Sequence, residues 1–150
     1  MKMKKVIAAA MVAAMLLGSC GKQQKDVDIE ALAEEIVTSV SFDDTLEEID
    51  DSMISMLYDI TGYTDAVLYK GSGATAEEVA VFKMDSDDDA KTALDEANAL
   101  IQSQIKSYES YMPDEVSRLE DAVVKREGVY VVVVVSSDTS KAEEILDENF

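Results

Sequence analysis

The chain has 150 residues, of which 32 are acidic and 13 basic, giving a net charge of −19, with one cysteine and no histidine. This charge repels nucleic acid and anionic lipid head groups, so we expect neither as a direct partner. Without histidine or a second cysteine, the chain cannot form a Ser-His-Asp or Cys-His catalytic arrangement, a His/Cys zinc site or an internal disulfide.

The first twenty residues, Met1–Cys20, have the layout of a secretory signal peptide. Lys2, Lys4 and Lys5 form a basic start, and the apolar run Val6–Leu17 follows. That run is shorter than the roughly 20 apolar residues that a membrane-spanning helix needs. The sequence therefore predicts a cleaved signal peptide and no permanent transmembrane span.

The end of this segment resembles the lipobox of bacterial lipoproteins. Leu17 fits its large aliphatic position, Gly18 and Ser19 fit its small positions, and Cys20 fits the invariant one. The resemblance implies cleavage between Ser19 and Cys20, an S-diacylglycerol on the Cys20 sulfur and acylation of its new N-terminus. The alternative is an ordinary secretory signal with a chance cysteine.

The remainder divides into a tether and one domain. We expect residues 1–19 to be removed, 20–26 to hold the lipidated cysteine and a short flexible polar tether, and 27–150 to fold as a single acidic domain. Three of the 13 basic residues lie in the signal and all 32 acidic ones lie outside it, so the exported part has a side-chain charge of 10 − 32, or −22.

Apolar residues at helical spacing predict two N-terminal helices. The first is Ile29–Val40, capped by Asp26 or Asp28. The second is less regular and runs from Leu46 to Ile60, and its methionines are interpreted as flexible core filler.

A pair of strands follows, at Ala66–Tyr69 and Glu78–Met84, and the glycine-rich turn between them predicts an antiparallel hairpin. That turn, Gly71–Ala74, lacks the Lys-Ser/Thr of a Walker loop and the third glycine of a dinucleotide loop, so it is not a phosphate site.

The longest predicted element is a helix from Asp87 to about Tyr111, with one apolar stripe of period near 3.6. Pro113 ends it, and a short helical turn at Asp114–Leu119 follows.

Strands at Val123–Glu127 and Val129–Val135 come next, joined by a turn at Gly128. Every residue of the second strand is apolar, which predicts that both of its faces are covered. Either the long helix and the N-terminal helices cover them, or a partner or second copy of the chain covers one face, making a homo-oligomer through this strand. A last helix begins after Ser137 or Asp138.

The resulting order, α-α-β-β-α-β-β-α, has hairpins separated by a helix and no repeated strand-helix-strand crossover. It predicts an α+β fold with a four-stranded antiparallel sheet, on which the long helix, the C-terminal helix and the N-terminal helices pack.

Clustered acids are the one feature that suggests site chemistry. Asp85, Asp87, Asp89 and Glu96 occupy four positions of a calcium-binding loop. Ala90 stands where that loop needs glycine, so Ser86 or Asp87 capping the long helix is the simpler interpretation, and we assign no metal site.

Adjacent carboxylates such as Glu34-Glu35 and Glu47-Glu48 would fit a glycosidase dyad in composition. Such pairs are common on exposed helix faces and nothing in the sequence selects one of them, so we assign no catalytic residue and no cofactor.

The sequence combines five features in a fixed order. They are the lipobox, an acidic helix, the strand Glu77–Lys83, a long helix closing on Tyr111-Met112-Pro113, and the Gly128-Val129-Tyr130 entry into a valine-rich strand. The chain resembles a family of small lipoproteins from Gram-positive, mostly anaerobic bacteria that is classified as a domain of unknown function. The resemblance implies no activity, substrate or catalytic residue, and only Cys20 carries a role over from it.

These observations lead to two functional hypotheses. The first is a non-enzymatic, lipid-anchored domain on the extracytoplasmic face of the cell membrane that binds an unknown envelope protein or peptide. The alternative is a lipoprotein that binds a small ligand or cation and is associated with transport.

Overall fold

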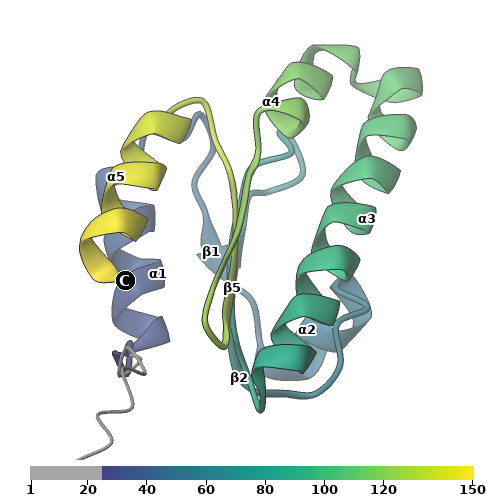
Figure 1. The fold of residues 1–150 in the computed structure, drawn as a ribbon. Helices are drawn as coiled ribbons and strands as arrows, with labels where there is room; N and C mark the ends of the chain where they lie inside the picture. The colour runs from purple at the N-terminus through teal and green to yellow at the C-terminus, as the bar shows by residue number, and fades with distance from the viewer. Residues whose placement is uncertain (1–24) are drawn as a thin grey trace, which may run out of the picture.

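A computed structural model describes residues 25–150, which form an antiparallel sheet with helices on both faces (Figure 1). The α+β class and the antiparallel sheet predicted from the sequence are confirmed. The elements in chain order are α1 (Ile29–Ser39), β1 (Glu47–Glu48), α2 (Asp51–Leu57), β2 (Tyr63–Lys70), β3 (Glu78–Met84), α3 (Asp87–Tyr111), η1 (Pro113–Glu115), α4 (Val116–Glu120), β4 (Val123–Glu127), β5 (Tyr130–Val135) and α5 (Thr139–Asn149).

The sheet has five strands in the order β1-β2-β3-β5-β4. The two predicted hairpins, β2-β3 and β4-β5, meet side by side, because β3 pairs with β5 in antiparallel register, Val81 opposite Val132. Gly128 makes the β4-β5 turn with a positive φ of 56°, a backbone conformation that favours glycine. β3 and β5 therefore lie inside the sheet.

The segment before β2 differs from the expected long helix Leu46–Ile60. Glu47 and Glu48 instead form β1, which pairs with the end of β2 and adds a fifth strand to the predicted four. The helix α2 begins only after Asp50, whose carboxylate accepts the N–H of Ser52 at 3.0 Å and caps it. A two-residue strand with exposed side chains has no apolar period, so the sequence pattern could not reveal it.

One face of the sheet packs against α3, with α2 and α4 on the same side (Figure 1). The apolar stripe of α3 contributes Ala90, Ala93, Ala97, Ile101 and Ile105 to this layer, all of them buried. Small residues in the first half of the stripe let the helix lie close to the strands. The helix starts at its predicted residue, where Ser86 accepts the N–H of Asp89 at 3.1 Å.

The other face of the sheet is covered by α1 and α5, which lie beside each other (Figure 1). Val131, Val133 and Val135 of β5 point towards α3, and Val132 and Val134 point towards α1 and α5. All five are at most 1 % exposed. The prediction that both faces of this strand are covered is confirmed, and helices of the same chain cover them.

One detail of that prediction was wrong, and so was the interpretation of the methionines in the second N-terminal helix. Of the two N-terminal helices, only α1 covers the face opposite α3, because α2 lies on the α3 side with Ile54 and Tyr58 in that cluster. The methionines of α2 are not core filler either, since Met53 and Met56 are exposed. The buried side of this short helix is already supplied by Ile54 and Tyr58, one helical turn apart.

Both apolar clusters consist of residues from Val27 onward. The residues of β5 are at most 1 % exposed. Residues 25–150 thus contain a closed core of their own, with each sheet face covered by helices from the same chain.

Candidate functional site

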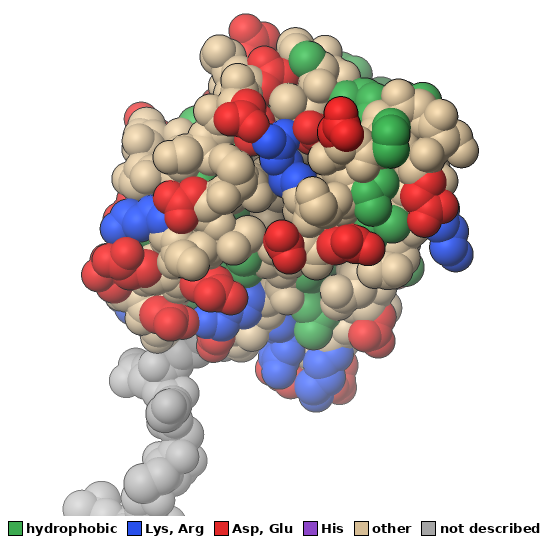
Figure 2. All heavy atoms as spheres, turned by 90° about the horizontal axis from the view of Figure 1, so that it is seen from above, with side chains coloured by type: hydrophobic (Ala, Val, Ile, Leu, Met, Phe, Trp, Pro, Cys, Tyr) green, Lys and Arg blue, Asp and Glu red, His purple; other side chains and the backbone are tan. Residues whose placement is uncertain are grey.

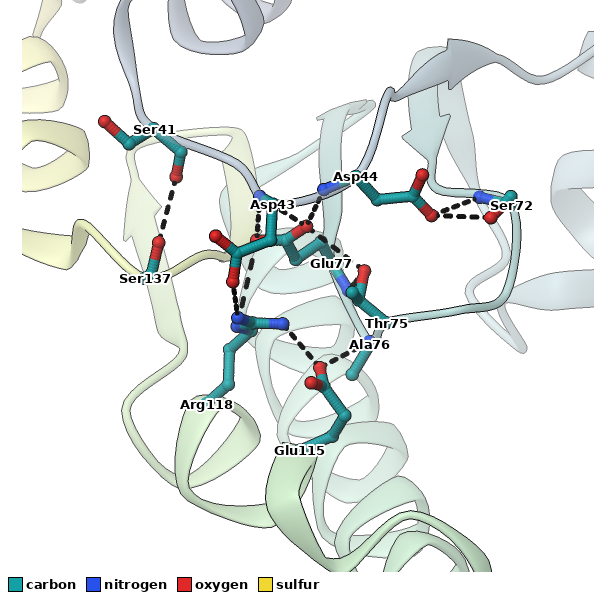
Figure 3. Close-up of polar contacts among 10 residues, drawn as sticks. All are labelled: Ser41, Asp43, Asp44, Ser72, Thr75, Ala76, Glu77, Glu115, Arg118 and Ser137. Atoms are coloured by element: carbon teal, nitrogen blue, oxygen red, sulfur yellow. Dashed lines mark hydrogen bonds and ion pairs between the residues drawn. The ribbon is translucent and has the colours of Figure 1, made fainter.

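Polar side chains gather at the end of the sheet that lies uppermost in Figure 1, around Glu77 (Figure 3). Glu77 is 1 % exposed although it is a carboxylate. Its two oxygens accept the N–H of Asp43 at 2.9 and 3.0 Å and the N–H of Asp44 at 2.8 Å, and the Thr75 hydroxyl lies 3.1 Å away. One buried carboxylate therefore fixes the chain between α1 and β1.

Arg118 of α4 is the cation of this cluster (Figure 3). Its guanidinium donates to Glu115 at 2.6 Å and to Asp43, and its Nε lies 3.8 Å from Glu77. Glu115 in turn accepts the N–H of Ala76 at 2.8 Å. Since carboxylates already surround it, Arg118 joins three segments of the chain and is not free to bind an anion.

Asp44 points the other way, towards the β2-β3 turn (Figure 3). Its carboxylate accepts the hydroxyl of Ser72 at 2.8 Å and the Ser72 N–H at 2.7 Å. The hydrogen bond from the hydroxyl, and then that from the N–H, hold the pKa of Asp44 below its ordinary value. A Cβ at Gly71 would lie 2.6 Å from this carboxylate, so a larger residue there would displace the Asp44 side chain. The predicted turn is confirmed, and two hydrogen bonds from Ser72 to the Asp44 carboxylate hold it in place.

A small hollow of about 200 Å³ lies beside Arg118. Figure 2 views the molecule from this end and shows acidic side chains spread over the face, with basic side chains among them. Hydroxyl and carboxylate groups line the hollow, chemistry that suits a hydrogen-bonding polar solute better than an anion or an apolar ligand. The lining residues are Asp114, Ser117, Arg118, Asp121, Ser136, Ser137 and Thr139.

A second buried carboxylate, Glu78, lies on the α3 side of the sheet and is 0 % exposed. Its Oε1 accepts the hydroxyl of Tyr58 at 2.7 Å, and its Oε2 pairs with Lys70, its neighbour across the β2-β3 hairpin. Burial, and then the charge of Glu78, raise the pKa of Tyr58 well above its ordinary value. Tyr58 therefore stays a hydrogen-bond donor at neutral pH and acts as part of the core.

This arrangement predicts alkaline destabilisation. Burial, and then a hydrogen bond with Tyr111, also raise the pKa of Tyr108, to about 12. Both phenols ionise near pH 10 in the unfolded chain. Their contribution to stability is complete below that pH and is lost as the pH rises from 10 through their higher folded values. We expect the melting temperature to fall over this range, and to fall less steeply in Tyr58→Phe.

Absorbance at 295 nm and circular dichroism, followed together from pH 9 to 12, measure this effect. The ionisation of Tyr58 should coincide with unfolding. If all six tyrosines ionise near pH 10 while the circular dichroism stays native, the assignment of a buried Tyr58–Glu78 pair is wrong.

Within residues 25–150, the acidic residues singled out in the sequence are not brought together into one site. The lipobox residues Leu17, Gly18, Ser19 and Cys20 lie outside the described residues. In the cluster Asp85–Asp89, Ser86 caps α3 as predicted.

Asp87 pairs with Lys91 at 2.9 Å and with Arg126 at 2.6 Å. Across residues 25–150, no three acidic, cysteine or histidine side chains are grouped so that they could hold a metal ion.

The adjacent carboxylates lie apart on exposed surfaces. Glu34 and Glu35 are on the outer side of α1, and Glu47 and Glu48 form the edge strand β1. The sequence did not single out Glu77, Glu78 or Arg118 as site residues, because charged side chains at the end of a strand or on a short helix are normally exposed. The one available signal was the pair Glu77-Glu78 itself, since successive strand residues point to opposite faces and this sheet is covered on both.

The beginning of the described chain is held firmly. The N–H of Val27 donates to the Tyr130 hydroxyl at 3.0 Å, and that hydroxyl lies 3.0 Å from Asp26. Lys83 donates to Asp26 at 2.7 Å. These contacts tie Asp26 and Val27 to strands β3 and β5. No helix within residues 25–150 is long and apolar enough to cross a bilayer.

Comparison with known proteins places these features in a family. The family model described as a domain of unknown function, DUF4358, matches residues 38–136, from the end of α1 to the end of β5. No curated protein and no solved structure matches the chain. The match includes the whole sheet, α3 and the residues of both buried carboxylate clusters, and leaves out most of α1 and all of α5. Because the match spans well over half of the sequence, the chain belongs to the DUF4358 family, a family defined by a domain of unknown function.

Proposed function

We propose that this protein is a lipid-anchored, non-enzymatic domain on the extracytoplasmic face of the cell membrane, which binds a protein or peptide of the envelope. The observation that carries the proposal is the segment Leu17-Gly18-Ser19-Cys20, placed after a basic start and a short apolar run. The family match supports a common fold and leaves the activity open.

The contacts of Asp26 and Val27 support this role because they limit the length of the tether between Cys20 and the domain. Only residues 21–25 separate the lipidated cysteine from Asp26, and at full extension they reach about 20 Å. A lipid on Cys20 would keep the domain within that distance of the bilayer. The end with Glu77 and Arg118 lies opposite the start of the described chain and would face outward (Figure 1).

Charge supports a domain that stands clear of the bilayer. The exported part carries −22, so an anionic bilayer repels it, and the domain would stand away from the surface on its tether. Anchoring confines the domain near neighbouring envelope proteins and raises its effective concentration for them. Affinity for a partner can then be modest and still give appreciable occupancy.

The anchor is tested by replacing Cys20. In cells supplied with labelled palmitate, we expect the wild-type chain to incorporate the label and Cys20→Ala to incorporate none, because the thioether needs the cysteine sulfur. Ser19→Ala is the matched control, since alanine also fits the small position. Equal labelling of wild type and Cys20→Ala, or an unmodified Cys20 in the mass spectrum of the mature wild-type protein, would contradict the proposal.

A further inference from the structure

Helix α2 presents apolar side chains on the side that faces away from the core. Four large hydrophobic side chains are exposed among the described residues, and α2 holds three of them. Met53 is 45 % exposed, Met56 72 % and Leu57 38 %. Their spacing of three and four residues puts them on one face of the helix. This group, Met53, Met56 and Leu57, is referred to below as the α2 patch.

The α2 patch sits on a supported helix. Ile54 and Tyr58 bury the opposite side of α2 against the sheet, and the Tyr58 hydroxyl is bonded to Glu78. Asp50 caps its first turn through Ser52. The patch is therefore an ordered surface of flexible apolar side chains, and methionine in such a position adapts readily to different partners.

Acidic residues border the α2 patch at both ends of the helix. Asp50 and Asp51 begin the helix, and Asp59 follows it; all three are exposed. Glu96 of α3 lies near Asp59, since burial and then the Asp59 charge raise the pKa of Glu96. The sequence from Lys25 to Lys70 contains no other lysine or arginine, so no cation of this segment offsets these charges.

We propose that the α2 patch and its acidic border dock a basic amphipathic segment of a partner protein. Apolar residues of that segment cover the methionines, and its lysines or arginines pair with the border. A second copy of the chain would bring the same acidic border against it, and an anionic bilayer would be repelled in the same way, so charge selects a basic partner. The inference rests on the proposed function, because it names the chemistry of the partner that the anchored domain binds.

The probe is a helical peptide of leucine and lysine with all leucines on one face, and its matched control is a peptide of the same composition with the leucines scattered. Residues 21–150, which contain the closed core, are titrated against each labelled peptide by fluorescence anisotropy. We expect the amphipathic peptide to bind about tenfold more tightly than the scattered one. Met53→Ser/Met56→Ser should remove that advantage without changing the charge, whereas Tyr111→Ser, at the other exposed hydrophobic side chain, should leave it.

Several results would overturn the inference. Equal binding of the two peptides, or an advantage that survives Met53→Ser/Met56→Ser with native circular dichroism, would show charge attraction without docking. Dimerisation in sedimentation, or binding to phosphatidylglycerol vesicles, that is lost in the double variant would assign the patch to a second copy or to the membrane. The assay needs no lipid on Cys20, so it can fail while palmitate labelling succeeds, and the reverse.

Discussion

Replacing Glu77 by alanine is expected to lower the free energy of unfolding by about 3 kcal/mol, because hydrogen bonds to an ionised group contribute roughly 1.5–3 kcal/mol each. The change removes the acceptor for the N–H groups of Asp43 and Asp44 and one carboxylate beside Arg118. Urea unfolding at pH 7 measures it. Hydrogen exchange should show the loss directly, as faster exchange at the amides of Asp43 and Asp44.

The matched control lies in the same network. Asp43→Asn removes the charge of a largely exposed partner of Arg118, and such pairs contribute at most about 1 kcal/mol. Glu77→Gln should fall between the two variants, since its amide oxygen can replace only one carboxylate oxygen. If Glu77→Ala costs no more than Asp43→Asn, the buried carboxylate is not what holds the chain between α1 and β1.

The burial of Glu77 and Glu78 shows where sequence reasoning reaches its limit. Their partners are far away in the chain: Glu77 binds residues 34 and 33 positions earlier, and Glu78 binds Tyr58, 20 positions earlier. A carboxylate beside an apolar strand is normally exposed, and only such partners make its burial tolerable. The local sequence pattern contains no information about partners this far away in the chain, so only the structure shows that the two carboxylates are buried.

Elements with a long or unbroken apolar pattern were predicted closely. Strands β3 and β4 and helix α3 have their predicted bounds. The apolar stripe of α3 runs along a 25-residue helix, and Gly128 marks the end of β4. The short elements were less predictable. β1 has no apolar residue, and the methionines of α2 satisfy a helical period on the wrong face, so burial could not be assigned from spacing alone.

The second large effect is expected at Lys70. Its ammonium group pairs with Glu78, whose side chain is 0 % exposed while that of Lys70 is 29 % exposed. Lys70→Met keeps the aliphatic stem and leaves Glu78 with Tyr58 as its remaining partner. Removing one member of a buried pair costs about 3–5 kcal/mol, and the partial exposure of Lys70 places our expectation near 3 kcal/mol.

A double-mutant cycle separates the charge pair from packing. Glu78→Gln alone leaves Lys70 able to reach solvent, and we expect it to cost about 1 kcal/mol. In Lys70→Met/Glu78→Gln no buried charge is left unpaired, so the double variant should be more stable than Lys70→Met, giving a coupling of at least about 1 kcal/mol in urea unfolding. Additive costs would instead assign the effect to lost packing of the lysine stem. A positive coupling would show that the interaction between Lys70 and Glu78, and not packing of the lysine stem, offsets the burial of a carboxylate at the first residue of a central strand.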